Sequence, residues 1–218
     1  MVLRVDTLNN QAYSILKDKI LKKEIASGTR LVDSQLAEEF GISRTPLRDA
    51  IRKLAEDGLV VSSPGKKGYY VYQPSPKDID EIFELRLMFD IFAAEKVINE
   101  VIPNNPSALE ELKESYRAGL EASPESFVST DEDFHDTAVR LCGNSRMLAM
   151  YKDIRSQTRA FRSVTSSDNA RIAKARNYHE RIFKGFCAGD LPATIDAIRL
   201  HVQYSRQDAL GDYIQENG

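Results

Sequence analysis

The sequence contains little cysteine and little histidine: two cysteines, Cys142 and Cys187, and three histidines in 218 residues. Two cysteines do not make a disulfide framework, which favours a reducing cytoplasm. There is no run of about 18 apolar residues, so we expect no membrane span. The first 20 residues also lack the basic-then-apolar pattern of a secretory signal, so we predict a cytoplasmic protein.

The net charge of −3 argues against nucleic acid as a partner, but this average hides an asymmetry. Residues 1–76 carry 12 Lys/Arg and 9 Asp/Glu (+3), which leaves 18 and 24 (−6) for residues 77–218. The length suits two domains. We therefore expect only the basic front part to approach phosphates.

Residues 1–74 are predicted to form a winged helix-turn-helix domain. Apolar residues recur at helical spacing from Leu8 to Ile20, and two shorter helical patterns follow on either side of Gly41. Asp33 is predicted to cap the first of these helices, and Ser43 the second.

The second of these helices separates charge from apolar surface. It carries an apolar stripe and a basic stripe, namely Leu47, Ile51 and Leu54, and Arg44, Arg48 and Arg52. A recognition helix needs this division because it packs on its domain and enters the major groove at once. Arg44 and Arg48 could pair with guanine, and Thr45 suits a phosphate or a thymine methyl group. The alternative is an ordinary solvated face.

Strand-forming residues flank the segment "PGKKG", before it at Val60 and Val61 and after it in residues 69–72. This pattern predicts a two-stranded hairpin with Lys66 and Lys67 at its tip, placed as a basic wing beside the recognition helix. An ordinary surface hairpin is the alternative.

The stretch "GTRLVDSQLAEEFGISRTPLRDAIRKLAEDGLVVSSPGKKGYYV" resembles the winged helix-turn-helix of GntR-type bacterial transcription regulators, most specifically in "SRTPLRDA". The resemblance implies DNA contacts from Arg44, Thr45 and Arg48, and from the wing. The wing candidates are Gly65, Lys66 and Lys67. Members of the family often have Arg or Glu near Ser34. The serine therefore changes one DNA contact that is usual in the family and comes from the helix before the recognition helix.

Residues 77–218 follow the Pro-rich join "QPSPKD" and have helical periodicity throughout. The pattern predicts an antiparallel all-α bundle. Its expected helices are 78–101, 106–121, 124–142, 145–163, 169–188 and 191–210.

All three histidines of the chain fall on or near inward faces of these helices. Asp131 and His135 are four residues apart and therefore share a face. His179 interrupts an apolar stripe, and His201 lies at the edge of another. Each histidine alone is more often a hydrogen-bonded core residue. Together with a carboxylate they suit a divalent metal ion, Zn²⁺ before Ni²⁺ or Mn²⁺, with a coordination position left open.

The segments "DEDFHDTAVRLCGN", "YHERIFKGFCAGD" and "IRLHV" resemble the FCD effector domain of the FadR-like branch of the GntR family. The resemblance implies a metal site at Asp131, His135, His179 and His201. It also makes Arg86, in "ELRLMF", a candidate effector contact. Asp90 stands where many members have glutamate.

These observations predict a DNA-binding regulator, a repressor or activator, rather than an enzyme. A small organic acid would bind at the open metal position, contacted by Arg86, Arg159 and Asn144. A homodimer would match a palindromic operator in double-stranded DNA. Two alternatives stay open: a metal-dependent hydrolase with an accessory nucleic-acid-binding domain, for which Glu180 is the nearest candidate base, and a regulator whose metal is purely structural.

Overall fold

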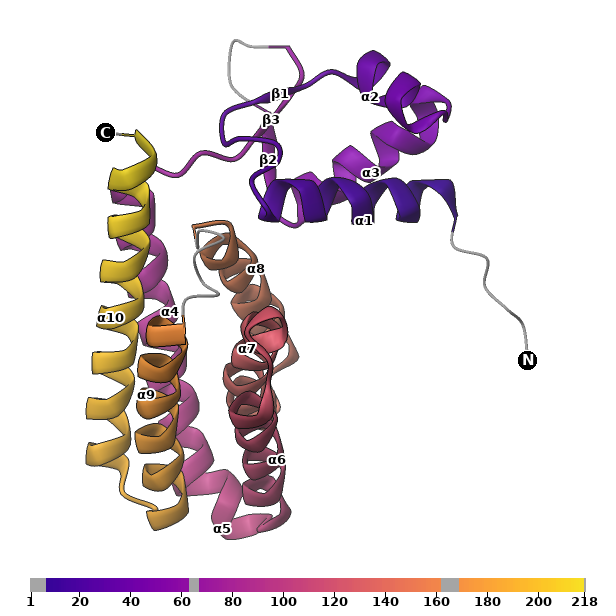
Figure 1. The fold of residues 1–218 in the computed structure, drawn as a ribbon. Coiled ribbons are helices and arrows are strands. Elements are labelled where there is room, and N and C mark those ends of the chain that lie inside the picture. Colours follow the sequence, from indigo (N-terminus) through magenta and orange to yellow (C-terminus); the bar gives the residue numbers. More distant parts are fainter. Residues whose placement is uncertain (1–6, 63–66, 162–168, 218) are drawn as a thin grey trace. The chain divides into compact units, whose positions relative to one another are not determined.

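The fold is mainly helical, as predicted, and divides into two compact units, Met1–Ser75 and Pro76–Gly218 (Figure 1). The computed structural model describes residues 7–62, 67–161 and 169–217. Among these residues, no helix is both long enough and apolar enough to cross a membrane.

In the described part of the N-terminal unit, the helices are α1 (Leu8–Leu21), α2 (Asp33–Phe40) and α3 (Arg44–Glu56). Gly41 ends α2 with a left-handed backbone (φ 63°), a conformation that glycine adopts without the strain of a side chain. Ser43 then occupies the N-cap position of α3. The apolar stripe of α3 is buried against α1, which leaves its basic stripe exposed.

Among the described residues, the sheet beside these helices has three strands, not the two predicted. β1 (Arg30–Leu31) and β2 (Val60–Ser62) both pair antiparallel with β3 (Tyr69–Val71), in the order β1-β3-β2. A strand of two residues is too short to show the alternation on which sequence prediction depends, and this is why β1 was missed.

The C-terminal unit is a helical bundle. Its helices are α4 (Pro76–Lys96), a π-helical turn η1 (Val97–Val101), α5 (Ile102–Asn104), α6 (Ser107–Glu121), α7 (Pro124–Leu141), α8 (Ser145–Phe161), α9 (Asn169–Ala188) and α10 (Leu191–Asn217). Helix α10 packs on α4 and α9, α7 packs on α6 and α8, and α8 packs on α4 (Figure 1). The contact surfaces of α4, α7, α8, α9 and α10 enclose the polar cluster described below.

The last helix is longer than predicted, because it does not end before Gly211. Arg171 on α9 donates hydrogen bonds to Asp208 (3.2 Å) and to the buried Asp212 (3.0 and 3.1 Å). These tertiary contacts hold the helix on both sides of the glycine, whose cost in a helix interior is only about 1 kcal/mol.

Candidate metal centre and nucleic-acid interface

The structure brings together the four predicted metal ligands from three helices. Asp131 and His135 come from α7, His179 from α9 and His201 from α10. All four are buried, and one potential ligand atom from each lies within 4.8 Å of the others. The apolar stripes that bury α9 and α10 against the bundle are therefore also what brings the imidazoles to one point.

The distances between these atoms fit a single ion. His135 Nε2 lies 3.0 Å from His201 Nε2 and 3.2 Å from His179 Nε2, and His179 Nε2 lies 3.1 Å from Asp131 Oδ1. Two ligands bound to one Zn²⁺ at about 2.1 Å are roughly 3.0–3.4 Å apart for angles between 90° and tetrahedral. Three imidazoles and one carboxylate also form a donor set that suits Zn²⁺, Ni²⁺ or Mn²⁺.

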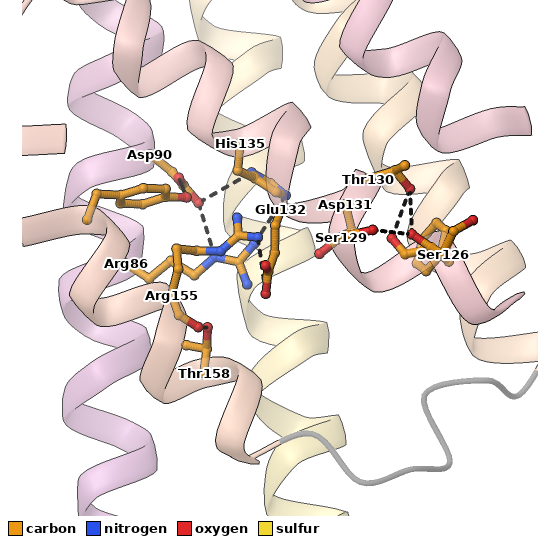
Figure 2. Close-up of polar contacts among 12 residues, drawn as sticks. Arg86, Asp90, Ser126, Ser129, Thr130, Asp131, Glu132, His135, Arg155 and Thr158 are labelled. Atoms are coloured by element: carbon orange, nitrogen blue, oxygen red, sulfur yellow. Dashed lines mark hydrogen bonds and ion pairs between the residues drawn. The ribbon is translucent and has the colours of Figure 1, made fainter. Parts of the chain in front are cut away.

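Asp90 on α4 lies close to His135, on the side of the ring that carries Nδ1 (Figure 2). Its Oδ2 is 3.8 Å from His135 Nδ1 and 3.4 Å from Arg86 Nε, and its Oδ1 accepts a hydrogen bond of 2.5 Å from Tyr151. A carboxylate on the Nδ1 side favours the tautomer that presents the Nε2 lone pair to a metal. Burial, and then the charge of Arg86, keeps the pKa of His135 well below its usual value, so His135 is neutral at pH 7.

Arg86 projects from α4 toward the same centre and is only 2% exposed. Its Nη2 lies 3.1 Å from both His135 Nε2 and His201 Nε2, the two atoms that a metal ion would use. A guanidinium group therefore lies next to the candidate metal position, and the role of Arg86 as an effector contact, which the family resemblance implies, stays a prediction.

A second buried arginine, Arg155 on α8, was missed by the sequence analysis. It is 5% exposed, lies over the ring of Tyr151 and has its Nη2 4.0 Å from Glu132 (Figure 2). Its Nη1 is buried and makes no hydrogen bond within the part of the chain that the structure describes. The only signal in the sequence was that Arg155 follows Tyr151 by four residues, which places both side chains on one face of α8. This spacing indicates burial only once the contact between Tyr151 and Asp90 of α4 is known.

Two further predicted effector contacts receive little support. Asn144 is exposed, and its Oδ1 accepts a hydrogen bond from the backbone N–H of Met147 at the start of α8. This is helix capping, and His135 lies roughly 9 Å of helix rise before the end of α7. The structure gives Asn144 a capping role, and its assignment to the effector stays an untested prediction. Arg159 belongs to α8, and its side chain lies outside the described residues.

The predicted DNA-contacting residues of the N-terminal unit lie on its surface. Arg44, Thr45 and Arg48 are exposed along α3, Ser34 is exposed at the start of α2, and Lys67 is exposed beside the hairpin. Gly65 and Lys66 lie outside the described residues.

Asp33 does not cap α2, contrary to the sequence prediction. It is the first residue of the helix, Val32 occupies the N-cap position, and no side chain caps the helix. The carboxylate of Asp33 instead accepts hydrogen bonds from Arg44 and Arg48.

A groove of about 490 Å³ runs beside the recognition helix and was not predicted. Arg30, Arg48 and Arg52 line it, together with Asp33 and Gly68. Arg30 lies close to Gly68, where an added Cβ would be 3.2 Å from Arg30 Nε. The sequence signal for Arg30 was weak, because its place beside the wing depends on the short strand β1.

Comparison with known proteins bears on both units. Residues 81–204 match the FCD domain family, and residues 8–71 match the family described as bacterial regulatory proteins, gntR family. The HTH-type transcriptional regulator YdhC of Bacillus subtilis is 27% identical over 80% of this chain and 78% of its own. The gluconate operon transcriptional repressor of Bacillus licheniformis is 29% identical over 77% and 68%. A GntR transcriptional regulator from Rhodococcus sp. RHA1 has a similar fold, with a TM-score of 0.69, 20% identity, and coverage of 93% and 97%.

Proposed function

The chain is a bacterial transcriptional regulator that belongs to the GntR family and carries an FCD domain, and from this premise we propose that a divalent metal ion and a small organic acid together control its binding to operator DNA. The recognition surface is formed by α3, the start of α2 and the wing. The sensor is the polar cluster of the helical bundle. A regulator of this kind works on genomic DNA in the bacterial cytoplasm, the location that we propose.

The observation that carries the sensor role is the position of Arg86. A cation bound by His135 and His201 would have the Arg86 guanidinium at close range, and like charges in a buried site repel strongly. An anion that contacts both the ion and Arg86 removes this conflict. A carboxylate is such an anion, because it can bind a metal through one oxygen and an arginine through the other.

Arg155 supplies a second cationic group in the same buried region. Its Nη1 has no hydrogen-bond partner among the described residues, and a buried unsatisfied donor costs about 1–3 kcal/mol. A second oxygen-bearing group of the acid would satisfy it. One of the relatives is a gluconate operon transcriptional repressor. Gluconate is a hydroxylated acid, which agrees with a polar acid rather than a fatty acid as the effector.

The test is to measure binding of Zn²⁺ to the metal-free protein by calorimetry, alone and with acetate, lactate, citrate or gluconate. We expect at least one acid to tighten Zn²⁺ binding, because it offsets the charge of Arg86. In Arg86→Gln, Zn²⁺ should bind more tightly without acid, and the effect of the acid should be lost. Unchanged Zn²⁺ affinity in the presence of every acid, in the wild-type protein, would instead favour a purely structural metal.

The hydrolase alternative has less support. Glu180, the candidate base next to His179, forms an ion pair of 2.7 Å with Lys184 one turn along α9. This pairing directs its carboxylate along the helix surface, and both side chains are partly or largely exposed. Steady turnover of small esters, amides or phosphates by the purified Zn²⁺-bound protein would reverse this conclusion.

We also propose that the regulator acts as a homodimer, with the exposed face of α4 as the contact between copies. Leu85, Met88 and Phe92 recur at helical spacing on one side of α4 and stay exposed. A second copy would cover this apolar face and would match a palindromic operator. Met88→Glu should shift the protein from dimer to monomer in sedimentation, whereas the same change at the exposed Met150 of α8 should not.

A further inference from the structure

The network around Asp33 links the two arginines that we propose read DNA. Arg44 and Arg48 lie one turn apart on α3, and both reach back to the first residue of α2. Arg44 Nη2 is 3.0 Å from each carboxylate oxygen of Asp33, and Arg48 Nε is 2.6 Å from Oδ2. One carboxylate thus fixes the directions of two long side chains that project from a neighbouring helix.

The contacts leave most of the donors of both arginines available. A guanidinium group has five N–H donors. In contacts with the described residues, Arg44 uses only Nη2 and Arg48 uses only Nε, so the two terminal nitrogens of Arg48 stay paired as a fork. Both side chains remain well exposed, at 57% and 61%. A fork of this kind matches the N7 and O6 acceptors of guanine.

Asp33 also changes the charge that DNA would meet. Two guanidinium groups and one carboxylate sum to +1 rather than +2. Hydrogen bonds from Arg44 and then Arg48 lower the pKa of Asp33, so the carboxylate is ionised at neutral pH. Asp33 also lines the groove of Arg30, Arg48 and Arg52, where it is the one acidic residue among the described lining residues. Phosphate binding without sequence choice depends on positive charge and is weakened by an acidic group at this place.

We propose that Asp33 is a positioning residue for DNA specificity: it holds Arg44 and Arg48 ready for base contacts while it weakens binding to the phosphates of any sequence. Because the arginines are already oriented, less side-chain freedom is lost when they dock on the correct bases. The first effect strengthens specific binding and the second weakens nonspecific binding, so both increase the ratio of specific to nonspecific affinity. This inference rests on the DNA-binding function proposed above.

The experiment compares Asp33→Asn with Asp49→Asn in the full-length protein. Asp49, on α3 next to Arg48, forms an ion pair with Arg52 and with no other described residue. The control variant therefore removes the same charge from the same unit and also releases one arginine, but leaves the shared contact intact. A specific duplex is first selected from random DNA with the wild-type protein. Its Kd and that of a scrambled duplex are then measured at several salt concentrations, after melting curves have shown equal folding.

For Asp33→Asn we expect tighter binding to scrambled DNA, with a salt slope steeper by up to about 1. We expect weaker binding to the selected duplex and a specificity ratio lower by about 10-fold or more. Asp33→Glu, which keeps a carboxylate, should retain more of the ratio than Asp33→Asn does. For Asp49→Asn the scrambled DNA should also bind more tightly, but the ratio should hold.

Equal changes of the ratio in the two asparagine variants would overturn the inference, because Asp33 would then act only as a surface charge. An unchanged ratio in Asp33→Asn would overturn it as well. If the wild-type protein selects no sequence at all, the proposed DNA-reading function itself fails, and the inference fails with it. These outcomes are distinct, because only the last one concerns the unmodified protein.

Discussion

Removal of one proposed ligand from the polar cluster should remove most of the stabilisation that a bound metal ion would give to the helical unit. Asp131→Asn is the sharpest perturbation, because the side chain is 1% exposed and the change is nearly isosteric. It removes the only carboxylate of the four-residue set and leaves the three imidazoles in place. The matched control is Asp133→Asn, on the same helix but exposed to solvent.

The size of the effect follows from linkage between binding and folding. At a free Zn²⁺ concentration of about 100 times Kd, the wild-type protein gains about 2.7 kcal/mol. For a unit of this size, about 3 °C of Tm corresponds to 1 kcal/mol, so the shift is about 8 °C. Mutation of a residue that only hydrogen-bonds to a metal ligand lowers metal affinity by about 10–100-fold. Loss of a ligand itself should therefore weaken Zn²⁺ binding by about 100-fold or more. At the same Zn²⁺ concentration the gain then falls to about 0.4 kcal/mol, or roughly 1 °C.

The assay is a calorimetric melt with and without Zn²⁺, in which the transition of the helical unit is followed separately from that of the N-terminal unit. Asp133→Asn should keep the full shift. Two results would refute the reasoning: a full shift in Asp131→Asn, or a shift of the wild-type protein that Asp133→Asn removes as well. Either would mean that Zn²⁺ binds elsewhere and that the four side chains do not share an ion.

Four other predictions follow from the same structure. Arg48→Ala should weaken binding to a selected duplex by about 1–3 kcal/mol and relax its sequence choice, as measured by fluorescence anisotropy against scrambled DNA. Lys67→Ala should weaken binding to all duplexes alike and lower the salt slope by about 1. Gly185→Ala should lower the stability of the helical unit by about 1–3 kcal/mol in thermal melts, because an added Cβ would lie 2.1 Å from Thr194 Oγ1 on α10. Arg155→Met should reduce the effect of an acid on Zn²⁺ binding, measured by calorimetry, and leave Zn²⁺ binding without acid nearly unchanged.

Sequence periodicity predicted which face of a helix points inward, but it did not predict which helices lie next to one another. The spacing of Asp131 and His135 placed both on one side of a helix, and the interrupted apolar stripe around His179 placed that residue inward. These are local properties of one helix. Which helices meet is decided by packing over long distances, so the cluster could be expected only from the sum of three inward histidines.

Arg155 shows why the sequence analysis missed a buried charge. Arg155 and Arg159 both lie on α8 and look equivalent in a helical pattern. Arg155 is buried because Glu132, from α7, and Tyr151, held by Asp90 of α4, surround it. Partners from distant segments compensate the burial of a charge, and they leave no trace in the local sequence.

The same limit explains the correction at the start of α2. Aspartate favours the N-cap position, so Asp33 was predicted to cap this helix. In the structure Asp33 instead accepts hydrogen bonds from two arginines of the next helix. Charge-assisted hydrogen bonds are roughly twice as strong as neutral ones, and this preference outweighs a cap when arginines lie within reach.

The buried polar cluster is not explained by stability. Arg86, Asp90, Asp131 and Arg155 are all nine-tenths or more buried within one bundle. Buried ion pairs can often be replaced by well-packed apolar side chains without loss of stability, and such replacements even stabilise some proteins by about 1–4 kcal/mol. A bundle selected only for stability would place leucine or phenylalanine at these positions. We propose instead that two arginines beside three imidazoles and two carboxylates form a site in which a bound cation and a bound anion each strengthen the binding of the other, and this is the property that a sensor of an acid requires.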